Sequence, residues 1–66
     1  MSARMFTAID ISETGEAVVD QFVAAHTTAA VRRAQFAAEG VMLQLWSEGR
    51  LLGSWRRVGR RTFHPA

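Results

Sequence analysis

The segment VMLQLW at residues 41–46 is apolar at almost every position, and this feature most limits the folds open to the chain. Alternate side chains of a strand point to opposite faces, so a strand over residues 41–48 would be apolar on both faces. One helix covers only one face of a small sheet. We therefore expect the second face to be covered by another chain or by sequence outside these 66 residues.

The small size of the chain also favours oligomerisation. A domain of this length buries only about 60% of the surface that its unfolded chain exposes, so disulfides, metals or a partner subunit usually add stability. The chain has no Cys, and its two histidines, His26 and His64, form no ligand cluster with the acidic residues. We expect no metal and no other cofactor, and a homodimer or higher oligomer.

Hydrophobic spacing predicts one helix and three strands. Strands are predicted over residues 5–12, 41–48 and 51–58. Residues 16–39 are rich in Ala and contain no Gly or Pro, and helical spacing gathers their apolar residues on one stripe: Val18, Val19, Phe22, Ala25, Ala29, Phe36 and Ala37. Gly40 follows where a helix commonly ends in the left-handed conformation. The predicted order is β-α-β-β.

Two glycines have specific roles in the predicted hairpin of strands 41–48 and 51–58. Gly49 lies in the turn Glu48-Gly49-Arg50 and tolerates a positive φ. Gly53, inside the last strand, indicates a bulge or the close approach of a ligand or another backbone.

Arginine is concentrated at the end of the sequence. Residues 49–66 hold five Arg and no acidic residue, whereas residues 1–48 hold three Arg and six acidic residues. A dense basic segment attracts phosphates, and Trp55 and Phe63 can stack on bases, so a nucleic-acid binder is one interpretation. A flexible basic tail over residues 59–66, beside a single domain over residues 1–58, is the simpler one. We therefore do not expect nucleic acid among the partners.

The N-terminal segment MSARMFTAID lacks the apolar stretch of a signal peptide. No apolar run approaches the roughly 20 residues that cross a bilayer. We expect a cytoplasmic protein without a membrane partner.

His26 and Arg33 interrupt the apolar stripe of the predicted helix. They are seven positions apart and therefore lie on the same helical face. A charge on an apolar face is costly without a partner, so the two residues line a cavity, pair across an interface, or extend to the edge of the face. A lone histidine in such a place is more often a satisfied structural residue than a catalytic one.

Four consecutive motifs occupy residues 32–55: the helix end RRAQFAAEG, the strand VMLQLW with its Leu-Trp pair, the turn EGR and the strand LLGSW. Together with MFTAIDIS upstream, they resemble the muconolactone delta-isomerase family over about residues 5–55. The resemblance implies an α+β fold: the β-α-β-β half of a ferredoxin-like domain, with its sheet paired to a second subunit in a dimeric α+β barrel. The second α-β half of the family has no counterpart here, so we expect a truncated or reduced relative.

The resemblance also implies a reaction, the proton-shift isomerisation of a small unsaturated lactone or acid in aromatic catabolism, without a cofactor. Such chemistry needs a proton carrier and a group that binds a carboxylate, roles that suit His26 and Arg33. These two are the candidate catalytic residues, and Gln44, Trp46 and Trp55 are candidate substrate-binding residues, in a pocket between the helix and the sheet.

The isomerase itself carries an Arg-His pair just before its Leu-Trp pair, where this chain has Leu43 and Gln44. It has a further Arg after the Trp, where this chain has Ser47. The alternative is therefore a non-catalytic oligomerisation or interaction module that kept the fold and lost the active site. For Trp46 and Trp55, packing in a core or an interface is the structural alternative.

Overall fold

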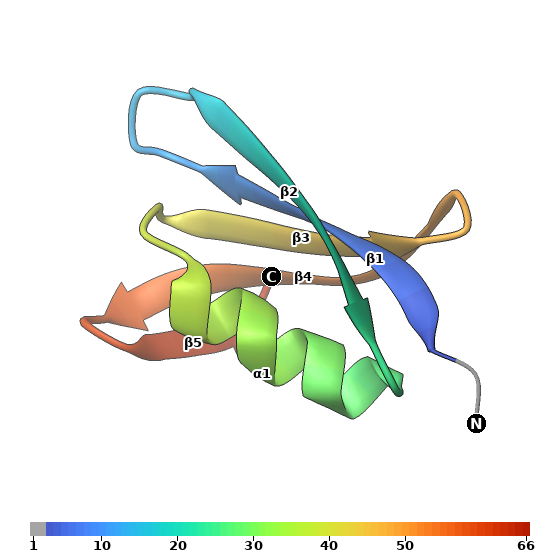
Figure 1. Ribbon diagram of the computed structural model, residues 1–66. Helices are drawn as coiled ribbons and strands as arrows, with labels where there is room; N and C mark the ends of the chain where they lie inside the picture. Colours follow the sequence, from blue (N-terminus) through green and yellow to red (C-terminus); the bar gives the residue numbers. More distant parts are fainter. Residues whose placement is uncertain (1–2) are drawn as a thin grey trace.

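The computed structural model describes residues 3–66 as one antiparallel sheet with a helix across one of its faces (Figure 1). The elements are β1 (Arg4–Ile11), β2 (Ala17–Ala24), α1 (Thr27–Ala37), β3 (Met42–Ser47), β4 (Arg50–Gly59) and β5 (Thr62–Pro65). The strand order in the sheet is β2-β1-β3-β4-β5. The α+β class is therefore confirmed. No helix in the described part of the chain is long and apolar enough to span a bilayer.

The first half of the predicted helix is a strand, and this prediction was wrong. Residues 17–24 form β2 and pair with β1 along its whole length, so the order is β-β-α-β-β-β rather than β-α-β-β. A tight turn joins the two strands: the Ser12 N–H donates to the Glu16 carbonyl at 2.9 Å, and Gly15 has a φ of 88°. The valines of β2 favour a strand, and pairing with β1 satisfies its backbone groups on that side.

The helix begins only at Thr27, because His26 caps it. The His26 side chain accepts a hydrogen bond from the Ala29 N–H through Nδ1 at 3.2 Å, and its backbone is extended. This contact satisfies one of the N–H groups that the first turn leaves without a partner.

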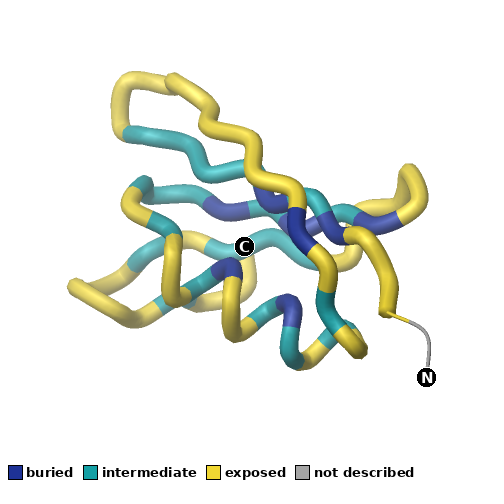
Figure 2. Tube along the Cα trace, viewed as in Figure 1, coloured by how far each residue is buried: buried dark blue, intermediate teal, exposed yellow. Residues whose placement is uncertain are grey.

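The core lies between α1 and the sheet and is small (Figure 2). The helix contributes only two buried alanines, Ala30 and Ala34, which lie one turn apart and let it approach the sheet closely. Phe6 of β1 and Phe22 of β2 are cross-strand partners whose ring centroids are 6.1 Å apart. The whole buried apolar set is Phe6, Ala8, Phe22, Ala30, Ala34, Leu43 and Leu45.

Close packing against residues 10–11 requires a glycine at position 40. The prediction that Gly40 ends the helix in the left-handed conformation was wrong. The helix ends at Ala37, and its C-cap, Ala38, is extended, with φ −66° and ψ 136°. A Cβ on Gly40 would lie 2.3 Å from the carbonyl oxygen of Ile11 and 2.5 Å from Oδ1 of Asp10. The Asp10 carboxylate accepts hydrogen bonds from the N–H groups of Glu39 and Gly40, each at 2.8 Å.

Arg57 of β4 holds the same loop, residues 38–40, from the other side. Its Nε donates to the Gly40 carbonyl and its Nη2 to the Ala38 carbonyl, both at 2.7 Å. The guanidinium also donates to the Arg60 carbonyl and lies 4.6 Å from the ring centroid of Phe63. Arg57 is thus a structural residue that supplies donors to carbonyls at the end of the helix.

The hairpin of β3 and β4 follows its prediction. Glu48 and Gly49 both have positive φ, 52° and 76°, as a two-residue turn of this hand requires. The register shifts between Leu45 and Trp46, so Gly53 is next to the predicted bulge. The close approach at Gly53 comes from within the strand, because a Cβ there would lie 2.4 Å from the ring of Trp55.

Residues 62–65 form β5, where the sequence predicted a flexible tail over residues 59–66. The strand pairs with β4, and the Ala66 N–H donates to the Ser54 carbonyl at 2.9 Å. Phe63 packs against the core and below Arg57, which gives this short strand one apolar anchor. Residues 62–65 are too few to show a pattern of alternating apolar and polar residues. The strand is formed mainly by backbone pairing with β4, which the sequence does not show.

We expect Gly40→Ala to lower the free energy of unfolding by about 2 kcal/mol, because the new methyl group would overlap backbone atoms that cannot move freely. Gly59→Ala is the matched control, since its Cβ would meet only Thr62 at 3.6 Å, an ordinary contact. Urea unfolding followed by circular dichroism measures both. Equal stability of the two variants would contradict the role given to Gly40.

Candidate functional site

The face of the sheet opposite α1 has no covering layer in the described residues. Phe6, Ala8, Leu43 and Leu45 point toward the helix and are buried, so their neighbours along the strands point the other way. We call this surface the open face; its residues on the four longer strands are Met5, Thr7, Ile9, Ile11, Ala17, Val19, Gln21, Val23, Met42, Gln44, Trp46, Leu51, Ser54 and Arg56.

Several large apolar side chains of the open face are exposed to solvent. Met5 is 53% exposed, Val19 60% and Val23 53%, and the register pairs Met5 with Val23 and Ile9 with Val19. Single exposed apolar residues are common, but a continuous group of them usually marks a contact surface. The open face is therefore the candidate functional site.

Trp46 and Gln44 lie together on the central strand of this face. The indole Nε1 of Trp46 donates to Oε1 of Gln44 at 3.0 Å, and both side chains are partly buried. On β1 their partners are Thr7 and Ile9. The hydrogen bond satisfies the indole N–H, so the ring can pack against another apolar surface without losing a polar contact.

The other three predicted site residues lie elsewhere. Trp55 lies against the core on the α1 side of the sheet, with its ring beside Gly53. His26 is exposed and caps α1. Its observed contact is the one expected of a structural histidine. Arg33 is exposed, and its guanidinium lies 4.5 Å from the ring centroid of Phe22.

A cavity of about 250 Å³ lies between the helix and the sheet. Its lining consists of apolar residues and the carboxylates of Asp10 and Asp20, and none of the five predicted site residues contributes to it. Proton transfer needs an acid and a base within reach of one substrate atom, and neither His26 nor Arg33 lines this cavity. The described residues hold no cluster of three His, Asp or Glu side chains that could bind a metal.

No protein family, curated protein or solved structure matches the chain. The resemblance to muconolactone delta-isomerase and the isomerisation that it implies therefore stay predictions. The contacts, exposure and charges of the chain itself are the grounds on which a function can be inferred.

The sequence predicted Gln44 and Trp46 as residues of a pocket between the helix and the sheet, and it did not indicate the rest of the open face. Val19 and Val23 lie on β2, which was predicted as helix, so their position opposite β1 could not be seen. The available signal was the high share of β-branched residues in AVVDQFVA, together with the Thr-Gly turn before it.

We expect His26→Ala to lower the free energy of unfolding by about 1 kcal/mol, because the Ala29 N–H loses its partner. His26→Asn should keep most of the stability, because its side-chain oxygen accepts the same hydrogen bond. Thermal unfolding of the three proteins compares them. If the Asn variant were as unstable as the Ala variant, capping would not be the role of His26.

Proposed function

We propose that the chain is a non-catalytic interaction module that forms a homodimer through its open face. The observation that carries this proposal is the uncovered, mainly apolar surface on β1, β2 and β3, on which the pairs Met5/Val23 and Ile9/Val19 lie on either side of Thr7 and Gln21, with Trp46 on the central strand. In a symmetric dimer the same face of both copies is buried, so a single apolar surface is sufficient.

The size of the open face suits a dimer. Four strands about 4.8 Å apart and about eight residues long cover roughly 500 Å² in projection, before the relief of the side chains is counted. A standard interface buries about 800 Å² of accessible surface on each partner. The face is therefore of the right order for one complete interface and needs no contribution from the helix side.

The charges of the open face also favour a second copy. Its residues on β1, β2 and β3 include no charged side chain, and Arg56 on β4 is the one charge among the residues that define the face. A two-fold axis parallel to the strands would place β4 of one copy over β1 and β2 of the other. The two Arg56 side chains would then lie about two strand spacings, roughly 10 Å, apart, and each is exposed and long enough to carry its guanidinium to the rim of the interface.

Trp46 is the expected centre of the interface. Aromatic residues in the middle of a contact surface contribute most to binding when they are fully removed from water. The Gln44 amide keeps two N–H donors that can bond across the interface, since only its oxygen is used within the chain.

Two neighbouring valines of β2 provide a matched test. Val18 and Val19 are 65% and 60% exposed, but Val18 lies on the helix side of the sheet and Val19 on the open face. We expect Val19→Arg to convert a dimer into a monomer and Val18→Arg to leave the dimer intact, because only the former places a charge in the interface. Sedimentation equilibrium measures the mass of each.

The fluorescence of Trp46 and Trp55 gives a second readout. Dilution of the unchanged protein should shift the emission to longer wavelengths as Trp46 meets water, and Val19→Arg should show that emission at every concentration. A protein that stays monomeric up to about 1 mM, the weak limit of specific association, would refute the proposal. Equal masses for the two valine variants would refute it as well.

A further inference from the structure

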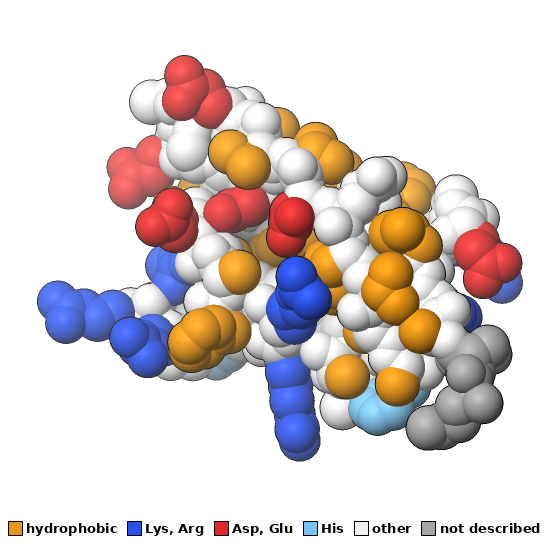
Figure 3. Space-filling model, in the orientation of Figure 1, with side chains coloured by type: hydrophobic (Ala, Val, Ile, Leu, Met, Phe, Trp, Pro, Cys, Tyr) orange, Lys and Arg blue, Asp and Glu red, His pale blue; other side chains and the backbone are white. Residues whose placement is uncertain are grey.

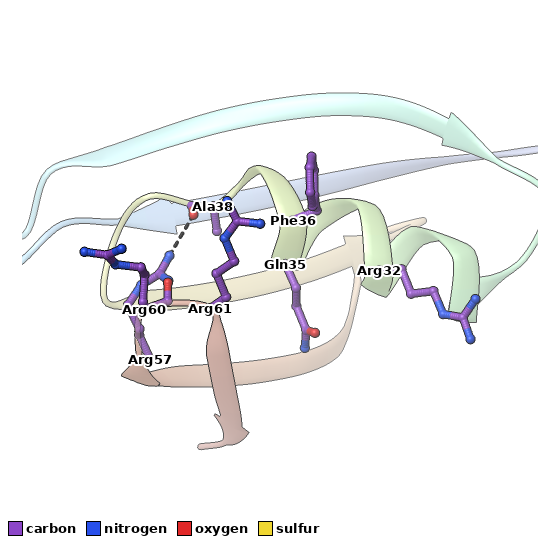
Figure 4. A pocket seen from close by; sticks show the side chains of 7 residues that line it. All are labelled: Arg32, Gln35, Phe36, Ala38, Arg57, Arg60 and Arg61. Atoms are coloured by element: carbon purple, nitrogen blue, oxygen red, sulfur yellow. Dashed lines mark hydrogen bonds between the residues drawn. The ribbon is translucent and has the colours of Figure 1, made fainter.

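A groove of about 490 Å³ lies on the helix side of the molecule, between the C-terminal half of α1 and the turn from β4 to β5. We call it the arginine groove. Arg32, Gln35 and Phe36 line it from the helix, and Arg57, Arg60 and Arg61 from the other side (Figure 4). No acidic residue contributes to the lining, and Figure 3 shows basic side chains projecting from the side of the molecule where this turn lies.

Phe36 is the most exposed large apolar residue of the described chain, at 84%. The helix packs on the sheet through Ala30 and Ala34, so the fold makes little use of the Phe36 ring. An aromatic ring held in water beside arginines offers a flat surface on which a planar group can stack.

Three arginines of the groove are free to bind a ligand. Arg57 donates to three backbone carbonyls and is committed to the fold. Arg32, Arg60 and Arg61 are exposed, and their guanidinium groups have no hydrogen-bond partner among residues 3–66. A guanidinium group matches the geometry of a phosphate and binds it through paired hydrogen bonds.

The free arginines come from the two sides of the groove, Arg32 from the helix and Arg60 and Arg61 from the turn between β4 and β5. Arg32 is one helical turn before Phe36, about 6 Å along the axis, and its guanidinium is directed away from the ring. On the other side Arg61 extends toward the helix, whereas the Arg60 side chain points away from it (Figure 4). A mononucleotide has phosphate on one side of its base, whereas a polynucleotide has phosphates on both sides. An acidic peptide would use the arginines but would give Phe36 nothing to stack on.

We infer that the arginine groove binds single-stranded nucleic acid. One base stacks on Phe36, Arg61 binds the phosphate on one side of it, and the exposed Arg32 side chain turns to bind the phosphate on the other. A volume of about 490 Å³ lies within the range of sites that hold a group of nucleotide size. The groove and the open face are on opposite sides of the sheet, so both can be occupied at once.

Arg60 and Arg61 are among the arginines on which the sequence based a nucleic-acid interpretation, but the other residues of that interpretation are not used in the same way. Arg50 is at the turn between β3 and β4 and Arg56 is on the open face, so neither lines the groove. Trp55 and Phe63 are partly buried against the core. The stacking residue is Phe36, which the sequence placed on the apolar stripe of a longer helix.

Fluorescence anisotropy with two labelled oligomers tests the inference. The first is a twelve-residue oligothymidylate, and the second has the same phosphates with abasic sugars. We expect Phe36→Ala to weaken binding of the thymidylate about ten-fold and to leave binding of the abasic oligomer unchanged, since only the former loses stacking. Phe36→Tyr should bind like the unchanged protein.

Two arginine variants with the same net charge distinguish a specific phosphate contact in the groove from general electrostatic attraction to the oligomer. Arg61→Gln should weaken thymidylate binding and reduce the slope of log affinity against log salt by about 0.7, the value for one phosphate contact on a single strand. Arg50→Gln, outside the groove, should keep the slope of the unchanged protein. Circular dichroism confirms that each variant is folded.

Four results would each overturn the inference. These are equal affinity for the two oligomers, equal losses for the two arginine variants, competition by thymidine monophosphate at the same concentration as by the oligomer, and preferential binding of a phosphorylated peptide. The second would indicate general charge attraction, the third a free nucleotide and the fourth a protein partner.

Discussion

The loop at residues 38–40 is held by an aspartate on one side and an arginine on the other, and the arrangement of the remaining elements depends on these contacts. Asp10 of β1 accepts from the N–H groups of Glu39 and Gly40, while Arg57 of β4 donates to the carbonyls of Ala38 and Gly40. The backbone N–H and C=O groups of this loop are thus hydrogen-bonded to side chains, at a point where the helix no longer supplies partners. The loop ties β1, β4 and the end of α1 to the start of β3.

This fixed loop explains how so small a core suffices. The helix contributes two buried alanines, which contact the sheet closely but add little apolar area. Its position is set instead at its two ends, where Arg4 Nη2 of β1 donates to Thr27 Oγ1 at 2.8 Å and where the hydrogen bonds at residues 38–40 are made. Most of the outward surface of α1, including Phe36, therefore makes no packing contact with the sheet. The same holds for the open face, which contributes no residue to the buried core.

The sequence was sufficient where one local rule decided the structure. The alternation in residues 41–48 and the Glu48-Gly49 turn predicted the β3–β4 hairpin, and Gly53 predicted its bulge. It was insufficient for residues 17–24, because Val18, Val19 and Phe22 fit helical spacing as well as a strand, and only pairing with β1 decides between them. Gly40 was correctly singled out for the wrong reason, since its close neighbours Ile11 and Asp10 are about thirty positions away.

The structure places His26 and Arg33 differently from the sequence prediction for a related reason. Helical spacing over residues 16–39 placed His26 and Arg33 on one buried face, but the helix starts at Thr27 and both side chains are exposed. Trp46 and Gln44 could be paired from the sequence because they are two positions apart on one strand. The arginine groove could not, since it forms only when β5 folds back along β4 and brings the last turn beside the helix.

The location of α1 on a single side of the sheet has a consequence for assembly. Two copies joined through their open faces would form a four-layer particle, helix-sheet-sheet-helix, with the arginine grooves on its outer surfaces. Such a particle is bivalent, and its two sites face away from each other. A short strand could occupy only one site at a time, so the geometry favours bridging two separate strands, or two distant parts of one, over gripping a single segment.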